Sequence, residues 1–286
     1  MAGEVVTTTS TGAGLMERRQ ARILAQLALT SRVFNGVWVQ ESTNASSTQF
    51  PKYPAPGASA TAGTEANALT GNGTALTIAA ATATLKSLTY WTTVSKLYLG
   101  GGEDAAATVD AIIANEVVSS VDKEICSVIT EANFTTTPIN DVVTLSAFLE
   151  AKSTLENVGY NGTIYFIGSP HMIAGLMADA GTKFYPNANS QMITSGNIGS
   201  LYGVQCLQVP SGWLPSATTS GKISGFMYYK EWALGFAYRN MAAGGLVDFT
   251  TVEKHHSLEI GGTAYCDAAA LAATAGVICL SDSATL

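Results

Sequence analysis

The sequence predicts an α+β fold, and three observations lead to that prediction. An apolar stripe with helical spacing runs through residues 104–130. Before it, residues 41–74 show no helical period and are dominated by Ser, Thr, Ala and Gly. After it, helical and strand-like segments follow one another without the regular βαβ repeat of a doubly wound sheet or a barrel. The chain therefore combines one very long helix, a long extended segment and a mixed region.

The composition indicates a protein whose surface is largely covered by neighbours. Hydrophobic residues make up 47% of the 286 residues. Charged residues make up only 12%, which is about half the usual share. Since a lone globule must solvate a large surface, such scarce charge indicates that much of the surface faces other subunits. The net charge of −7 argues against a basic nucleic-acid footprint over the whole molecule.

An amphipathic helix is predicted near the N-terminus. After a Thr/Gly-rich start, the segment LMERRQARILAQLALTSRVF places apolar residues opposite its charges. Arg18, Arg19 and Arg22 form a small basic cluster on this helix, a candidate contact to another subunit, to nucleic acid or to an acidic partner. A solvated helix face or an intersubunit salt bridge is the simpler interpretation. The apolar run after the cluster is interrupted by Gln26 and Arg32, so no signal peptide is evident and cytoplasmic synthesis is expected.

A long flap is expected next. Residues 41–74 exceed an ordinary loop and carry Pro51, Pro54 and Pro56. The following segment, TALTIAAATATLKSLTYWTTVSKLYL, is rich in Thr, aromatic and β-branched residues, so the arm is expected to return as a strand. Together they predict a long two-stranded flap. If the flap makes its contacts between subunits, deleting residues 43–71 should leave a folded subunit that no longer assembles.

The longest helix is expected directly after the flap. Three glycines at 100–102 mark a break between two predicted elements. Glu103 and Asp104 then supply acidic side chains that favour a helix N-terminus. A helix over residues 104–130 would extend roughly 40 Å. Its apolar stripe consists of Val109, Ile113, Val117, Val121, Ile125 and Val128.

The region after this helix is predicted to contain both helices and strands. Thr144 is placed to cap a helix that Gly159 ends. A strand over 163–167 follows a turn at Asn161-Gly162. The residues of the helix that are expected to face inward are Leu145, Phe148, Leu149 and Leu155. Further strands are predicted at 204–209, 224–239, 246–260 and 275–280.

Ser169 raises the question of catalysis, because it lies between a predicted strand and a predicted helix, two residues before His171. A nucleophile elbow requires G-x-S-x-G, and the sequence Ile167-Gly168-Ser169-Pro170-His171 matches neither glycine position. Pro170 suits the first helical position, and a serine before it suits the cap. Ser169 is therefore predicted to cap a helix, with a serine hydrolase that uses Ser169 as the alternative.

Other residue patterns predict no catalytic site, metal site or cofactor. His255 and His256 are adjacent, so in a strand they face opposite sides and cannot share one metal ion. The carboxylates of Asp179 and Glu231 show no pairing in the sequence. The glycine patterns match neither dinucleotide-binding nor phosphate-binding motifs. The cysteines are far apart and are expected to be buried thiols without disulfides: Cys126, Cys206, Cys266 and Cys279.

The order of these elements resembles the major capsid protein of tailed bacteriophages, a fold shared with encapsulins and the floor of the herpesvirus shell. The segment YNGTIYFIGSPHMIAGLMADAGTKFY is similar to the axial-domain strand that leads into a short helix. GNIGSLYGVQCLQVPSGW resembles a glycine-rich turn entering a strand, GFMYYKEWALGFAYR a strand pair, and AGVICLSD a closing strand. The resemblance implies an N-arm at 1–36, an E-loop hairpin at 37–101, the spine helix of a peripheral domain at 102–135, an axial domain at 136–225, and strands returning to both domains at 226–286.

The resemblance implies a structural subunit and not an enzyme. Such a subunit assembles as a homo-oligomer into the hexamers and pentamers of an icosahedral phage head that encloses double-stranded DNA, with weak non-specific contact between an acidic chain and that DNA. A portal protein is an expected partner, with a separate scaffolding or decoration protein as an optional one, since no long scaffolding segment precedes the N-arm. The chain is expected in the virion capsid after synthesis and assembly in the host cytoplasm, with no membrane partner.

Two further functions stay open at this point. An encapsulin-type nanocompartment has the same fold and holds a protein cargo in place of a genome. A secreted β-rich surface protein would also be rich in Thr, Ala and Gly, but the amphipathic first helix and the very long predicted helix weigh against it.

Overall fold

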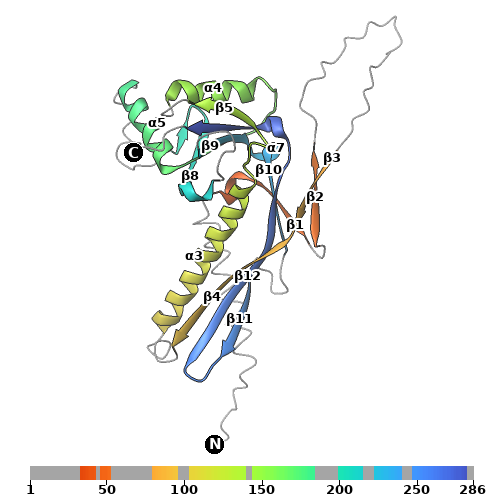
Figure 1. The fold of residues 1–286 in the computed structure, drawn as a ribbon, viewed down its shortest axis with the longest axis vertical. Helices are drawn as coiled ribbons and strands as arrows, with labels where there is room; N and C mark the ends of the chain where they lie inside the picture. The colour runs from red at the N-terminus through yellow and green to blue at the C-terminus, as the bar shows by residue number, and fades with distance from the viewer. Residues whose placement is uncertain are drawn as a thin grey trace, which may run out of the picture. The chain divides into compact units, whose positions relative to one another are not determined.

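The chain divides into two compact units (Figure 1). The first comprises Met1–Thr48, Thr82–Ser127 and Phe236–Ala269, and the second comprises Gln49–Ala81, Val128–Gly235 and Ala270–Leu286. The predicted N-terminal helix, with Arg18, Arg19 and Arg22, lies outside the described residues. The computed structural model describes residues 33–42, 46–52, 79–95, 103–139, 144–183, 199–214, 222–239 and 247–281.

The first unit is built from a five-stranded sheet and one long helix. Four strands follow the order β1-β10-β12-β11, and β4 pairs with β12 as well. β12 is antiparallel to β11 and to β4, so that Ile260 lies opposite Thr251 on one side and Thr92 on the other. The elements are η1 (Phe34–Gly36), β1 (Trp38–Ser42), β4 (Lys86–Ser95), α3 (Glu103–Ser127), β10 (Leu234–Arg239), β11 (Val247–Glu253) and β12 (Ser257–Ala270).

Helix α3 confirms the predicted long helix and most of its apolar stripe. The buried members, each at most 5% exposed, are Val109, Ile113, Val117, Val121 and Ile125. The helix ends at Ser127, before the predicted end, so Val128 lies in a turn and is half-buried. The Asn133 side chain donates to the Val128 carbonyl (2.8 Å), which satisfies an acceptor just past the helix end.

Strand β4 presents its residues alternately to α3 and to the exposed side of the sheet. Along the strand, exposed positions alternate with half-buried ones, and Val94 is buried. Helix α3 lies beside β4 (Figure 1). On this side the sheet carries Leu88, Tyr90, Thr92 and Val94 from β4 and Ile260, Ala264 and Cys266 from β12. One face of the sheet is therefore covered by the long helix.

The second unit is built from a six-stranded mixed sheet and two main helices. Its strand order is β5-β13-β9-β6-β8-β7, and the β5–β13 and β6–β8 pairs are parallel. Helix α4 contacts β9 and β13, and α5 contacts β6 and α4 (Figure 1). The elements are β5 (Thr135–Ile139), α4 (Leu145–Glu156), β6 (Ile164–Gly168), α5 (Pro170–Lys183), β7 (Ser200–Leu201), β8 (Val204–Gln208), η2 (Ser211–Trp213), β9 (Lys222–Tyr229), α7 (Lys230–Ala233), η3 (Ala273–Ala275) and β13 (Gly276–Ser281).

The central strands of the six-stranded sheet are buried on both faces. On β9, the successive residues Phe226, Met227 and Tyr228 are each 0% exposed, although neighbouring side chains of a strand point to opposite faces. On one face the rings of Phe226 and Tyr228 stack with centroids 4.9 Å apart. On the other face, Phe166 meets Phe148 of α4 edge-on at 5.2 Å. Such continuous burial explains the uninterrupted apolar run of this strand.

The flap differs from the prediction in two respects. β2 (Ser47–Lys52) and β3 (Ala79–Thr84) form a separate two-stranded sheet, but β4, which was assigned to the flap, pairs with β12. Phe50 of β2 is fully buried, and its ring lies 3.0 Å from where a Cβ on Gly235 would be. Since deleting residues 43–71 would remove this core side chain, that deletion is now expected to destabilise the subunit.

Two other sequence predictions are corrected by the packing. Leu149 was expected to face inward but is 37% exposed, because the buried face of α4 runs through Leu145, Phe148, Ala151 and Leu155. The segment expected to form a strand pair instead forms β9 and β10, which lie in different sheets and are separated by the short helix α7. The predicted cap is confirmed, since Thr144 Oγ1 accepts a hydrogen bond from the Ala147 N–H (3.3 Å).

Candidate functional site

Ser169 caps a helix, as the sequence predicted. Helix α5 begins at Pro170, and the Met172 N–H donates to Ser169 Oγ (3.3 Å). Ser169 is only 5% exposed. A buried hydroxyl that already accepts a backbone hydrogen bond is not presented to a substrate. Ser169 is therefore not placed to act as the nucleophile of the serine hydrolase that was the alternative.

The cysteine thiols are not reactive nucleophiles at neutral pH. Burial raises the pKa of each of the four thiols to about 12. Since the thiolate is the reactive form, these side chains behave as small apolar groups. All four are free; Cys126, Cys266 and Cys279 are buried, as predicted, whereas Cys206 is half-buried.

The two adjacent histidines lie in a hairpin turn and not in the predicted strand. The Lys254 N–H donates to the Ser257 carbonyl (2.9 Å), which closes the turn between β11 and β12 around His255 and His256. Both rings are exposed, with centroids 6.5 Å apart. Within the described part of the chain, no group of three or more His, Cys, Asp and Glu side chains could hold a metal ion. None of the described helices is long and apolar enough to cross a membrane.

Asp179 has a structural role that the sequence did not indicate. Its Oδ2 atom accepts a hydrogen bond from the Leu145 N–H (2.7 Å), so a carboxylate of α5 caps the first turn of α4. A negative charge at a helix N-terminus is favourable because it faces the positive end of the helix dipole. Thr144 and Asp179 together satisfy two of the amides that the start of α4 leaves without helical partners.

The side of the β4–β12–β11 sheet that faces away from α3 is exposed, and we call it the outer face. Its central row crosses from Trp91 through Gly261 to Thr250. Cross-strand pairs here include the hydroxyls of Thr89 and Thr263, which share a hydrogen bond (3.1 Å). The outer face includes Ser87, Thr89, Trp91, Thr93, Ser95, Thr250, Val252, Ser257, Glu259, Gly261, Thr263 and Tyr265.

Trp91 is the largest apolar group on the outer face. Its indole lies directly over Gly261, where a Cβ would come within 2.5 Å of the ring, so a glycine is needed for this close approach. The Trp91 side chain is nevertheless 47% exposed, and Val252, one row away, is 42% exposed. The outer face is therefore rich in hydroxyls and partly apolar, and its Glu259 is ion-paired with Lys254 of the adjoining turn.

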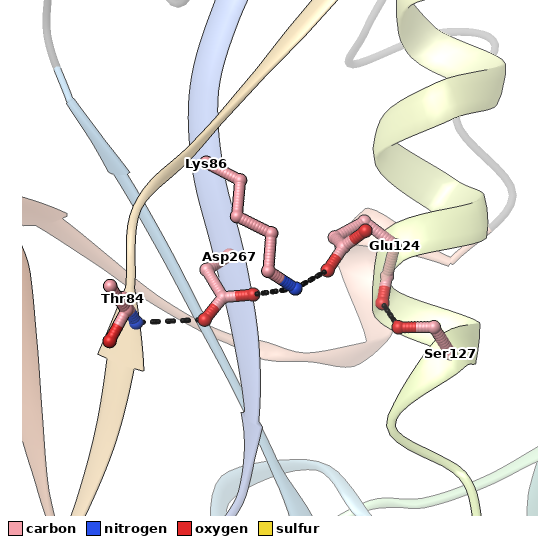
Figure 2. Close-up of polar contacts among 5 residues, drawn as sticks. All are labelled: Thr84, Lys86, Glu124, Ser127 and Asp267. Atoms are coloured by element: carbon pink, nitrogen blue, oxygen red, sulfur yellow. Dashed lines mark hydrogen bonds and ion pairs between the residues drawn. The ribbon is translucent and has the colours of Figure 1, made fainter.

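A charged cluster lies at the N-terminal end of β4, around Lys86. Lys86 Nζ is 2.8 Å from Glu124 Oε1 on α3 and 3.1 Å from Asp267 Oδ1 on β12 (Figure 2). The second oxygen of Asp267 accepts the Thr84 N–H (2.8 Å). The hydrogen bonds to Glu124 and then to Asp267 raise the pKa of Lys86 above its ordinary value. The cluster joins three elements of the first unit through one ammonium group.

Comparison with solved structures shows which fold this is. The chain superposes on the capsid structure of the cyanophage P-SCSP1u with a TM-score of 0.62 at 14% identity, covering 86% of both chains. The capsid of a native GTA particle gives a TM-score of 0.60 at 11% identity, covering 89% of this chain and 91% of that one. A virus-like particle from Pyrococcus furiosus gives 0.56 at 11% identity, covering 93% and 99%. The chain has the phage capsid fold. No family model and no curated protein matches the sequence.

Neither the exposed outer face nor the charged cluster around Lys86 was predicted from the sequence. The alternation of Trp91 with Ser and Thr along β4 was a readable signal for one exposed face. The partners of Lys86 were not readable, because Asp267 is far away in the sequence and meets β4 only through the pairing of β12.

Proposed function

We propose that this chain is a structural subunit that assembles with copies of itself into a closed capsid shell. The single observation that carries the proposal is the capsid fold, which extends over most of the chain in several structural neighbours. The low share of charged residues, 12%, supports it because a shell subunit covers much of its surface with neighbours. A structural role also accords with the capped Ser169 and with thiols that burial keeps neutral.

The outer face is a contact surface for a second copy of the chain in this proposal. Copies of an acidic chain repel one another, and the ion pair between Lys254 and Glu259 lessens that cost at one position of the outer face. Trp91 and Val252 supply the apolar area that association would remove from water. Arg18, Arg19 and Arg22 stay candidate contacts to other subunits or partners.

The finer parts of the proposal concern the particle. Hexamers and pentamers would form an icosahedral phage head that holds double-stranded DNA, with portal and optional scaffolding or decoration proteins as partners. The subunit would be made and assembled in the host cytoplasm and would reside in the virion capsid. The domain division into N-arm, E-loop, spine helix, axial domain and returning strands is part of this proposal.

A second candidate is a protein nanocompartment of the encapsulin type. It is favoured by the similarity to the virus-like particle from Pyrococcus furiosus, which covers 99% of that chain. The fold is compatible with both functions, so the contents of purified particles must distinguish them. Nuclease-protected double-stranded DNA would support the phage head, and a defined protein cargo would support the nanocompartment.

Sedimentation velocity and negative-stain electron microscopy of the purified chain over a concentration series test the proposal. We expect closed shells, or rings of five and six subunits. The fraction of the protein found in these assemblies should rise with concentration. A chain that stays monomeric at every concentration, both alone and with co-purifying partners, would contradict the proposal.

A further inference from the structure

The chain passes from one sheet to another at Leu85. β3 ends at Thr84 in the two-stranded sheet with β2, and β4 begins at Lys86 in the sheet with β12. Leu85 belongs to neither strand, and its N–H donates to the carbonyl of Ser46, just before β2 (2.9 Å). β3 and β4 are therefore joined through a single residue, Leu85.

One carboxylate binds the chain on both sides of this junction. Asp267 Oδ2 accepts the Thr84 N–H (2.8 Å) from the end of β3, and Oδ1 contacts Lys86 Nζ (3.1 Å) at the start of β4 (Figure 2). The Asp267 side chain is only 10% exposed. A carboxylate this poorly solvated needs partners for its charge, and it takes them from the two residues that flank Leu85.

Lys86 connects the same junction to the end of α3. Its ammonium contacts Glu124 Oε1 (2.8 Å), whose side chain is 16% exposed. Residues 124–127 read Glu-Ile-Cys-Ser and include no basic residue, although a helix C-terminus carries partial negative charge. Lys86 places a cation beside this turn, where it binds the Glu124 carboxylate. Without it, Glu124 and Asp267 would be two poorly solvated carboxylates held close together, each disfavouring the other.

We propose that Thr84, Lys86, Glu124 and Asp267 form an electrostatic lock that holds the β3–β4 junction at Leu85. The lock is closed while the Lys86 ammonium binds both carboxylates. Opening it releases the junction and leaves α3 and β12 in place, because their buried apolar residues, such as Ile125 and Ile260, are not part of it. The lock is a property of the subunit itself, and it is present whether or not a shell forms.

Hydrogen–deuterium exchange of the full, unassembled chain tests the lock. Lys86→Met keeps the length of the side chain and removes its charge. We expect the amides of Thr84 and Leu85 to exchange about three- to fivefold faster in this variant, because local opening of the junction becomes easier. Peptides from α4 should be unchanged. The matched control is Lys152→Met, which removes an ion pair with Glu156 on the surface of α4 (2.7 Å), and it should leave Thr84 and Leu85 unaffected.

A second substitution separates the lock from a general loss of stability. Adding Glu124→Gln to Lys86→Met removes the repulsion between the carboxylates, so exchange at Thr84 and Leu85 should slow again, recovering at least half of the effect. The lock is overturned if the Lys86→Met chain is folded and its Thr84 and Leu85 amides exchange as in the parent. It is also overturned by equal acceleration in all peptides with no recovery in the double variant. Because the readout is made on single subunits, failure of the lock and failure of shell assembly are separate results.

Discussion

The two large sheets differ in how much of their surface is covered. The central strands of the six-stranded sheet are buried on both faces, and Phe226, Met227 and Tyr228 in succession have no exposed surface. The sheet formed by β4, β12 and β11 is covered by α3 on one face and leaves Trp91 and Val252 exposed on the other. The first arrangement is complete in one chain. The second leaves apolar area that no described element of the chain covers, and the proposed shell contact would cover it.

The largest expected difference is between Phe226→Ala and Trp91→Ala. Phe226 is fully buried, so its removal leaves a cavity and should lower the free energy of unfolding by about 3–5 kcal/mol. Trp91 is 47% exposed, and its removal should cost about 1 kcal/mol. Chemical denaturation of the two variants measures the difference. Equal costs would mean that the outer face is as essential to the subunit's own core as the six-stranded sheet.

Substituting one glycine in each sheet by alanine sharpens the same comparison. A Cβ at Gly225 would come within 2.5 Å of Met172 Sδ and 2.8 Å of the Phe166 ring, and both side chains are buried and confined. We expect Gly225→Ala to cost about 1–3 kcal/mol. A Cβ at Gly261 would come within 2.5 Å of the Trp91 ring.

Gly261→Ala is the matched control, because the Trp91 ring has open space on its other side and can move away. We expect it to cost less than about 1 kcal/mol. Thermal or denaturant unfolding of both alanine variants provides the test, and a larger loss at Gly261 than at Gly225 would contradict the distinction between a closed and an open sheet.

The cap on α4 predicts a smaller effect within the second unit. Asp179→Ala leaves the Leu145 N–H without this acceptor and should lower the free energy of unfolding by about 1 kcal/mol. Asp179→Asn keeps an oxygen acceptor and should lose less. Denaturant unfolding of both variants checks the order, and an alanine variant as stable as the parent would show that the cap is dispensable.

The smallest predicted effect concerns Lys86 at alkaline pH. Its folded-state pKa is raised above 10.5 by Glu124 and Asp267, so the stability it contributes is present below pH 10.5 and is lost as pH rises through the folded-state pKa. Because the side chain is 59% exposed, the contribution should be below about 1 kcal/mol. The difference in unfolding free energy between the parent and Lys86→Met should therefore shrink above pH 10.5. A difference that stays constant across this range would rule out a charge-dependent contribution.

Local features of this chain were predictable from sequence, and long-range pairing was not. The stripe on α3 and the caps at Thr144 and Ser169 depend on residues within one turn of each other, so their spacing was sufficient. The division of one β-rich stretch into β3 and β4 depends on which strands lie alongside them. Asp267 reaches the Thr84 amide across 183 positions of sequence, and no local pattern marks such a partner. The order of the elements nevertheless predicted the capsid fold.

Hydroxyl-radical footprinting of Trp91, on single subunits and on assembled particles of the same chain, tests the central claim most directly. Trp91 should be oxidised readily in the subunit and should be strongly protected in the particle, while Phe226 reacts slowly in both states. Particles in which Trp91 is as reactive as in the free subunit would contradict the claim that the outer face is covered by a second copy of the chain.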